Sequence, residues 1–102
     1  MTETIVSKPL QKILSELTGI DRFDVALHLA TKDLIRLKLK EAEAQIQNCE
    51  KRYGMAFDQF QRAWENDQIA NQHDYEVEKD YWEWEAATTD LDRLREMREK
   101  IV

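Results

Sequence analysis

The chain has 102 residues, of which 35% are charged and 42% hydrophobic, and its net charge is −6. This length predicts a single domain over residues 1–102, and the presence of only two glycines and one proline favours long amphipathic helices and an all-α fold. The acidic balance disfavours nonspecific binding to nucleic acid, because neutralising phosphates requires a basic surface.

The first element that the sequence predicts is a short helix over residues 7–18. Ser7 can cap its N-terminus and Pro9 lies in its first turn, where a missing N–H costs little. Gly19 follows the last apolar residue and is expected to end the helix. Its apolar stripe comprises Leu10, Ile13, Leu14 and Leu17.

A long helix is expected over residues 21–53, with Asp21 as its N-cap and Gly54 as its stop. It carries two apolar stripes with four-three spacing, about 100° apart around the helix. The first comprises Phe23, Leu27, Ala30, Leu34, Leu37 and Ala44, with a slip at Glu41. The second comprises Ile35, Leu39, Ala42, Ile46, Cys49 and Tyr53. One partner helix cannot cover both stripes, so we expect a second protein chain to cover the other.

Two further helices are predicted over residues 56–65 and 74–101, the second capped by Asp74. The short one carries the aromatic residues Phe57, Phe60 and Trp64. The long one has an inward stripe of Val77, Tyr81, Trp84, either Ala87 or Thr88, Leu91, Leu94 and Ile101. We expect the two long helices to form an antiparallel, coiled-coil-like hairpin that assembles into a helical bundle dimer. In the simplest register Trp84 lies near Ala44 and Leu91 near Leu37.

The single cysteine, Cys49, cannot form an intramolecular disulfide, and its place on an apolar stripe predicts a buried thiol. The N-terminus lacks the features of a signal peptide, and no apolar run approaches the length of a membrane span. We therefore expect a cytoplasmic protein that does not bind membranes.

No motif in the chain predicts catalysis, a metal site or a cofactor. A di-metal carboxylate bundle needs Glu three residues before His on two helices, but Val25 precedes His28 and Ala70 precedes His73 at that spacing. Paired-cysteine zinc sites and glycine-rich phosphate loops are excluded by composition. We expect a protein that is not an enzyme.

The segment around Trp82 is more informative. Residues 74–92 contain eight carboxylates and one lysine, Lys79. This acidic run is either a solvated face or a docking surface for a basic partner. On a helix Trp82 projects about 100° from Tyr81, so it either packs against Phe57 and Phe60 or is exposed as an interface anchor.

Three segments resemble small helical antitoxins of two-gene toxin-antitoxin modules from bacteria and archaea. The matching residues are Arg52-Tyr53-Gly54-Met55 followed by Phe57 and Phe60, then Tyr75-Glu76-Val77-Glu78-Lys79-Asp80, and finally Trp82-Glu83-Trp84-Glu85-Ala86. The resemblance covers roughly residues 34–94, and Ala56 stands where a serine is expected. It implies a protein that binds and neutralises a toxic enzyme, often a ribonuclease.

The partners expected from these observations are a cognate toxin encoded by the adjacent gene and a second copy of the chain. DNA binding is not expected, because the nearest candidate for a recognition helix begins with Asp21 and Asp24. The alternative function is a self-assembling structural or adaptor protein. The candidate interface residues are Leu27, Leu34, Ile35, Leu39, Ile46, Phe57, Phe60, Trp64, Tyr75, Tyr81, Trp82, Glu83 and Glu85.

Overall fold

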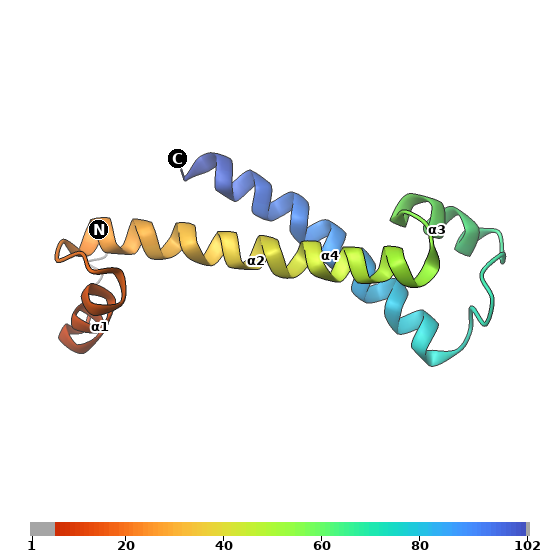
Figure 1. Cartoon of the computed structure of the whole chain (residues 1–102), viewed down its shortest axis with the longest axis horizontal. Helices are drawn as coiled ribbons and strands as arrows, with labels where there is room; N and C mark the ends of the chain where they lie inside the picture. Colours follow the sequence, from red (N-terminus) through yellow and green to blue (C-terminus); the bar gives the residue numbers. More distant parts are fainter. Residues whose placement is uncertain (1–5, 102) are drawn as a thin grey trace, which may run out of the picture.

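The computed structural model describes residues 6–101, which form four helices and no strand (Figure 1). The helices are α1 (Lys8–Thr18), α2 (Phe23–Tyr53), α3 (Phe57–Glu65) and α4 (Tyr75–Lys100). The prediction of an all-α fold is confirmed. The molecule is elongated, with extents of 56 × 29 × 24 Å.

Residues at the helix termini determine where α1 begins and ends and where α2 ends. The Ser7 hydroxyl accepts a hydrogen bond from the Leu10 N–H at 3.3 Å, and Gly19 ends α1 in the left-handed region at φ 72°. Gly54 ends α2 in the same way at φ 67°. Both positions require a residue that tolerates positive φ, which glycine does at little cost.

The start of α2 differs from the prediction. Arg22 occupies the N-cap position and no side chain caps the helix. Asp21 instead accepts a hydrogen bond from the Ser15 hydroxyl at 3.1 Å. The expected capping by Asp21 is therefore wrong, because its carboxylate binds α1.

Pairing of α2 with α4 decides which α2 stripe becomes core. The two helices run in opposite directions and cross near their middles, so their far ends diverge (Figure 1). The second stripe is the one that is covered, and its buried members are Ile35, Leu39, Ala42 and Cys49. In the first stripe, Leu27, Leu34 and Leu37 remain exposed.

The densest packing lies where α3 meets the C-terminal end of α2. Trp84, Phe60 and Cys49 are fully buried there. The Trp84 ring lies 5.0 Å from Phe60, between ring centroids, and 5.4 Å from Phe57. The predicted register, with Trp84 near Ala44, is wrong: Ala44 is exposed and Trp84 packs with Cys49. The aromatic residues of α3 provide the apolar surroundings that a large ring needs, which Ala44 cannot.

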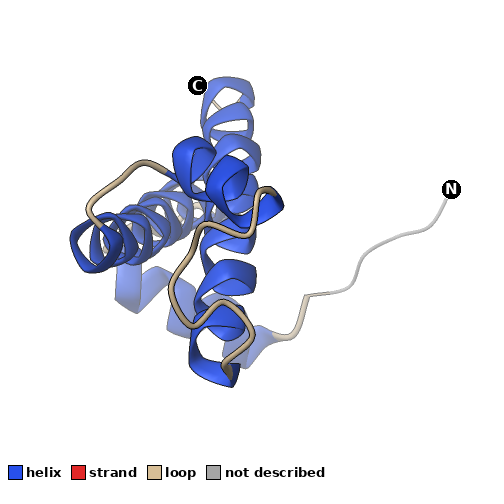
Figure 2. Ribbon diagram, turned by 90° about the vertical axis from the view of Figure 1, so that its right-hand side faces the viewer, coloured by secondary structure: helices blue, strands red, loops and turns tan. Residues whose placement is uncertain are grey.

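The loop from α3 to α4 crosses this end of the molecule (Figure 2). Gln72 is buried and its amide donates to the Trp64 carbonyl at 2.8 Å and to Asp67 Oδ1 at 3.3 Å. Ile69 packs against the aromatic core. The loop therefore helps to hold α3 in place.

The caps of the last two helices are weak. Ala56 occupies the N-cap of α3 and offers no side-chain acceptor, although its own N–H donates to Gln59 Oε1 at 3.2 Å. Asp74 stands at the N-cap of α4 as predicted, but its side chain makes no capping hydrogen bond. Glu76 and Glu78 lie in the first turn of α4, where their negative charges interact favourably with the positive end of the helix dipole and stabilise the helix.

Candidate partner-binding surface

The structure divides the candidate interface residues into two groups. Seven are used within the chain: Ile35, Leu39 and Phe60 are buried, and Ile46, Phe57, Trp64 and Tyr81 are half-buried against the aromatic core. Six are exposed, namely Leu27, Leu34, Tyr75, Trp82, Glu83 and Glu85. Only the exposed group offers surface to a partner, because the others already complete the fold.

Trp82 lies on the outward face of α4 and is 60% exposed. Tyr81 occupies the place against the short helix instead, with its ring 5.8 Å from Phe57 and 4.7 Å from Trp64. The alternative in which Trp82 packs against Phe57 and Phe60 is therefore wrong. Tyr75, seven residues before Trp82, is 73% exposed on the same face of the helix.

Carboxylates flank this aromatic strip on both sides. From the helical rotation of about 100° per residue, Glu78 and Glu85 lie on one side of Trp82, and Glu83 and Asp90 lie on the other. Lys79 is the one cation among residues 74–92, and its ammonium lies 3.6 Å from Glu83. The outward face of α4 thus combines two exposed aromatic rings with an excess of negative charge.

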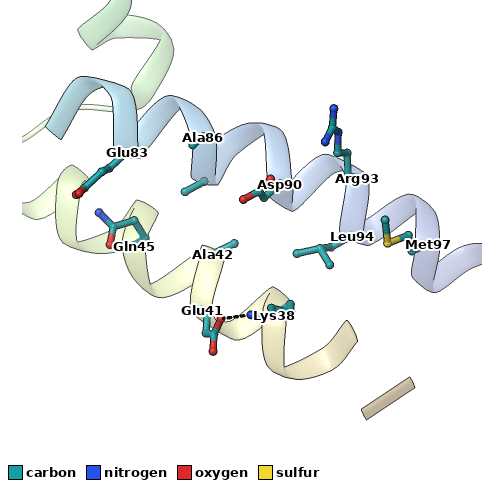
Figure 3. A pocket seen from close by; sticks show the side chains of 11 residues that line it. Lys38, Glu41, Ala42, Gln45, Glu83, Ala86, Asp90, Arg93, Leu94 and Met97 are labelled. Atoms are coloured by element: carbon teal, nitrogen blue, oxygen red, sulfur yellow. Dashed lines mark ion pairs between the residues drawn. The ribbon is translucent and has the colours of Figure 1, made fainter. Parts of the chain in front are cut away.

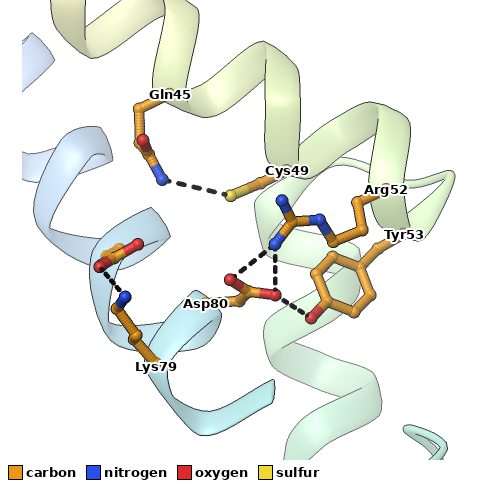
Figure 4. A network of polar contacts seen from close by, with 7 residues as sticks. Gln45, Cys49, Arg52, Tyr53, Lys79 and Asp80 are labelled. Atoms are coloured by element: carbon orange, nitrogen blue, oxygen red, sulfur yellow. Dashed lines mark hydrogen bonds and ion pairs between the residues drawn. The ribbon is translucent and has the colours of Figure 1, made fainter. Parts of the chain in front are cut away.

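A polar network on the other side of α4 joins it to the end of α2 (Figure 4). Arg52 Nη1 lies 2.8 Å from both oxygens of Asp80, and the Tyr53 hydroxyl donates to Asp80 Oδ2 at 2.5 Å. Asp80 is largely buried, with 13% of its side chain exposed. The network holds Tyr53 against the Phe60 ring, whose centroid is 4.7 Å away.

Burial and the contacts of this network shift the pKa values of Asp80, Tyr53 and Cys49. Burial acts to raise the pKa of Asp80, but the hydrogen bonds from Tyr53 and Arg52 outweigh it and hold that pKa below its ordinary value. Burial, followed by the hydrogen bond to Asp80, raises the pKa of Tyr53. Burial raises the pKa of the Cys49 thiol as well, which opposes formation of a thiolate.

A groove of about 560 Å³ runs between α2 and α4 (Figure 3). Charged side chains line much of it, including Glu41, Glu83, Asp90 and Lys38, and Lys38 pairs with Glu41 at 3.4 Å. Within residues 6–101, no group of three or more His, Cys, Asp or Glu side chains is placed to hold a metal ion.

A second groove of about 430 Å³ lies where the two long helices diverge. Leu34, Leu94, Met97 and Ile101 contribute its apolar wall. Leu34 also belongs to the uncovered first stripe of α2, which therefore borders an apolar groove along one edge.

Comparisons with known protein families, with curated protein sequences and with solved structures gave no match. None of the helices in the described part of the chain combines the length and apolar character needed to cross a membrane.

Sequence reasoning missed the Arg52, Tyr53 and Asp80 network. The residues on α2 and α4 are 27 and 28 positions apart along the chain. A signal was present, because Arg52 and Tyr53 belong to one segment of the antitoxin resemblance and Asp80 to another. Their pairing depends on the register of α4 against α2, which no local pattern specifies.

Proposed function

We propose that this chain is a noncatalytic, antitoxin-type protein that binds and neutralises a toxin in the cytoplasm. The observation that carries the proposal is the exposed Trp82 on the outward face of α4. An exposed tryptophan contributes little to the stability of its own fold, whereas tryptophan is enriched among the residues that dominate binding energy at protein interfaces.

The charge around Trp82 indicates the chemistry of the partner. From the helical rotation of about 100° per residue, Glu78, Glu83 and Glu85 flank the position of Trp82 on α4. Arginine or lysine over an indole face gains a cation–π contact, and nearby carboxylates strengthen it. A toxin that acts on nucleic acid needs a basic surface, so it fits this face.

Co-expression with the product of the adjacent gene tests the proposal. The complex is purified through a tag on one chain, and the mass of the eluted species is measured. A defined heterocomplex, together with relief of growth arrest when this chain is induced, supports the proposal. Growth arrest that persists and a chain that elutes alone contradict it.

Replacing Trp82 with alanine provides the sharper test. We expect the affinity for the toxin to fall by about 2 kcal/mol, or roughly 30-fold, if Trp82 is a binding hot spot. The free energy of unfolding is expected to change by less than about 0.5 kcal/mol, because the ring is exposed. Affinity is measured by titration calorimetry and stability by urea unfolding.

Leu10→Ala is a matched control, since Leu10 is 53% exposed but lies on α1. It is expected to leave toxin affinity unchanged. Equal affinity of wild-type and Trp82→Ala chains for the toxin excludes the outward face of α4 as the contact surface.

We also propose that the chain is a homodimer in solution, because its first α2 stripe is uncovered. The same observation favours the second candidate function, a self-assembling structural or adaptor protein. A homodimer that ignores the neighbouring gene product and does not rescue growth supports that alternative over the antitoxin.

A further inference from the structure

Most of the large exposed apolar side chains lie between Leu10 and Leu37. They lie on α1 or in the N-terminal half of α2, and the first stripe supplies Leu34 at 55% exposed, Leu37 at 53% and Leu27 at 48%. Met97 of α4 stands beside Leu34 across the apolar groove and is also exposed. Within residues 6–101, these four side chains are left exposed on one side of α2 and along the groove that α2 forms with α4.

The elongated shape leaves much of the chain accessible to solvent. The accessible surface is 8081 Å², whereas a compact monomer of 12.2 kDa exposes about 6,100 Å². A stable interface of standard size takes roughly 800 Å² of surface from each partner.

We infer that a second copy of this chain docks on the first α2 stripe, with the two α2 helices antiparallel and the two-fold axis between residues 35 and 36. The inference rests on the proposed homodimer but not on toxin binding. In this register Leu34 of each copy faces Leu37 of the other, and Leu27 faces Ala44. The largest exposed side chains of the stripe thus cover one another at the centre.

Charge complementarity selects this register. Asp33 and Lys40 both lie at the edge of the stripe. In this register Asp33 of each copy lies beside Lys40 of the other, which gives two pairs of opposite charge. Shifting the pairing by one heptad toward the N-terminus sets Asp33 against Asp33 instead. Lys40 makes no ion pair within residues 6–101, and Asp33 pairs only with Arg36 of the neighbouring turn, at 2.9 Å.

Glu41 decides the direction of pairing. It occupies a central position of the stripe, at the slip in the apolar pattern. A parallel, in-register pair places Glu41 against its own copy, where like charges repel. The antiparallel pair places it against the small side chain of Ala30, with Lys38 of its own chain 3.4 Å away.

The experiment measures the self-association constant of the full chain by sedimentation equilibrium. The wild-type chain is expected to have twice the monomer mass of 12.2 kDa. Leu37→Glu is expected to be monomeric, with helix content unchanged in circular dichroism because Leu37 is exposed. Tyr75→Glu, which also adds a charge at an exposed apolar position, is the control and is expected to remain dimeric.

Charge reversal tests the register without altering the apolar stripe. Asp33→Lys or Lys40→Asp alone is expected to weaken the dimer about tenfold, since each reverses both symmetry-related pairs. The double variant D33K/K40D exchanges the charges and is expected to restore wild-type affinity.

Each outcome decides a different point. A monomeric wild-type chain overturns both the proposed homodimer and its geometry. A dimer unaffected by Leu37→Glu overturns the choice of face, and a double variant no tighter than the singles overturns the antiparallel register. Toxin capture by the monomeric Leu37→Glu chain would show that the antitoxin proposal stands independently.

Discussion

At the scale of single residues, Asp80 determines how α4 is joined to the end of α2. Its carboxylate accepts hydrogen bonds from Arg52 and Tyr53, which adjoin the stop of α2 at Gly54. Hydrogen bonds to a charged acceptor are stronger than neutral ones. The exposed position of Arg52 reduces its share through solvent screening, so the Tyr53 hydrogen bond is the larger contribution.

Asp80→Asn is expected to lower the free energy of unfolding by about 1 to 2 kcal/mol, because the acceptor loses its charge while the tyrosine hydroxyl stays partly buried. Urea unfolding followed by circular dichroism measures the change. Asp92→Asn removes an exposed carboxylate that makes no ion pair within residues 6–101 and should change stability by less than about 0.5 kcal/mol. Equal stabilities of the two variants would contradict this role for Asp80.

The same carboxylate predicts a pH dependence. The pKa of Asp80 is lower in the folded chain than in the unfolded chain, where it is about 3.9. The unfolded chain therefore binds more protons, and the contribution of Asp80 is fully present above that value and lost as pH falls through the folded pKa. Between pH 5 and 2, Asp80→Asn should lose less stability than the wild-type chain.

At the scale of helices, α3 shows how a short element acquires a fixed position. Nine residues are too few for a helix that is stable alone. The helix is held because Phe60 is fully buried and contacts Trp84, Tyr53, Trp64 and Tyr81. Its N-terminus lacks the side-chain cap that a serine would supply at Ala56.

Ala56→Ser is expected to stabilise the chain by about 0.5 to 1 kcal/mol, because Ala56 already has the extended backbone of an N-cap at φ −76° and ψ 162°. A serine hydroxyl there can accept a hydrogen bond from the first turn of α3. The measurement is the midpoint of urea unfolding. Ala70→Ser, in the exposed loop, is the control, and an effect as large at Ala70 would rule out capping as the cause.

At the scale of the whole molecule, the two long helices diverge because they cross rather than lie side by side. Crossing brings the aromatic core together at one end and leaves Leu34 and Met97 uncovered at the other. A second copy on the α2 stripe would therefore complete an apolar core that one chain leaves open. In that arrangement the outward face of α4, with the exposed Trp82, would lie outside the contact between the two copies.

Coupling of folding to dimerisation predicts a melting temperature that rises with chain concentration, because only the folded chain associates. Over a 100-fold range of concentration, the wild-type chain should melt several degrees higher at the upper end. Leu37→Glu should melt at one temperature throughout. Thermal scans by circular dichroism provide the measurement, and a wild-type melting temperature independent of concentration would contradict dimerisation.

The sequence by itself determined the helices and most of their ends. Ser7, Gly19 and Gly54 act on the backbone within a few residues of themselves, so their effects can be read locally. The spacing of apolar residues also showed that α2 has two apolar faces. Both properties depend on one helix and need no knowledge of its neighbours.

Only the tertiary structure decided which face of α2 is core, which side chain Trp84 meets and which way Trp82 points. Periodicity defines a face relative to its own helix axis but does not state what that face packs against. The register of α4 followed from the volume of the Trp84 ring, which fits among Phe57, Phe60 and Cys49 and not against Ala44. These choices depend on packing between segments far apart in the chain, and local patterns carry no information about it.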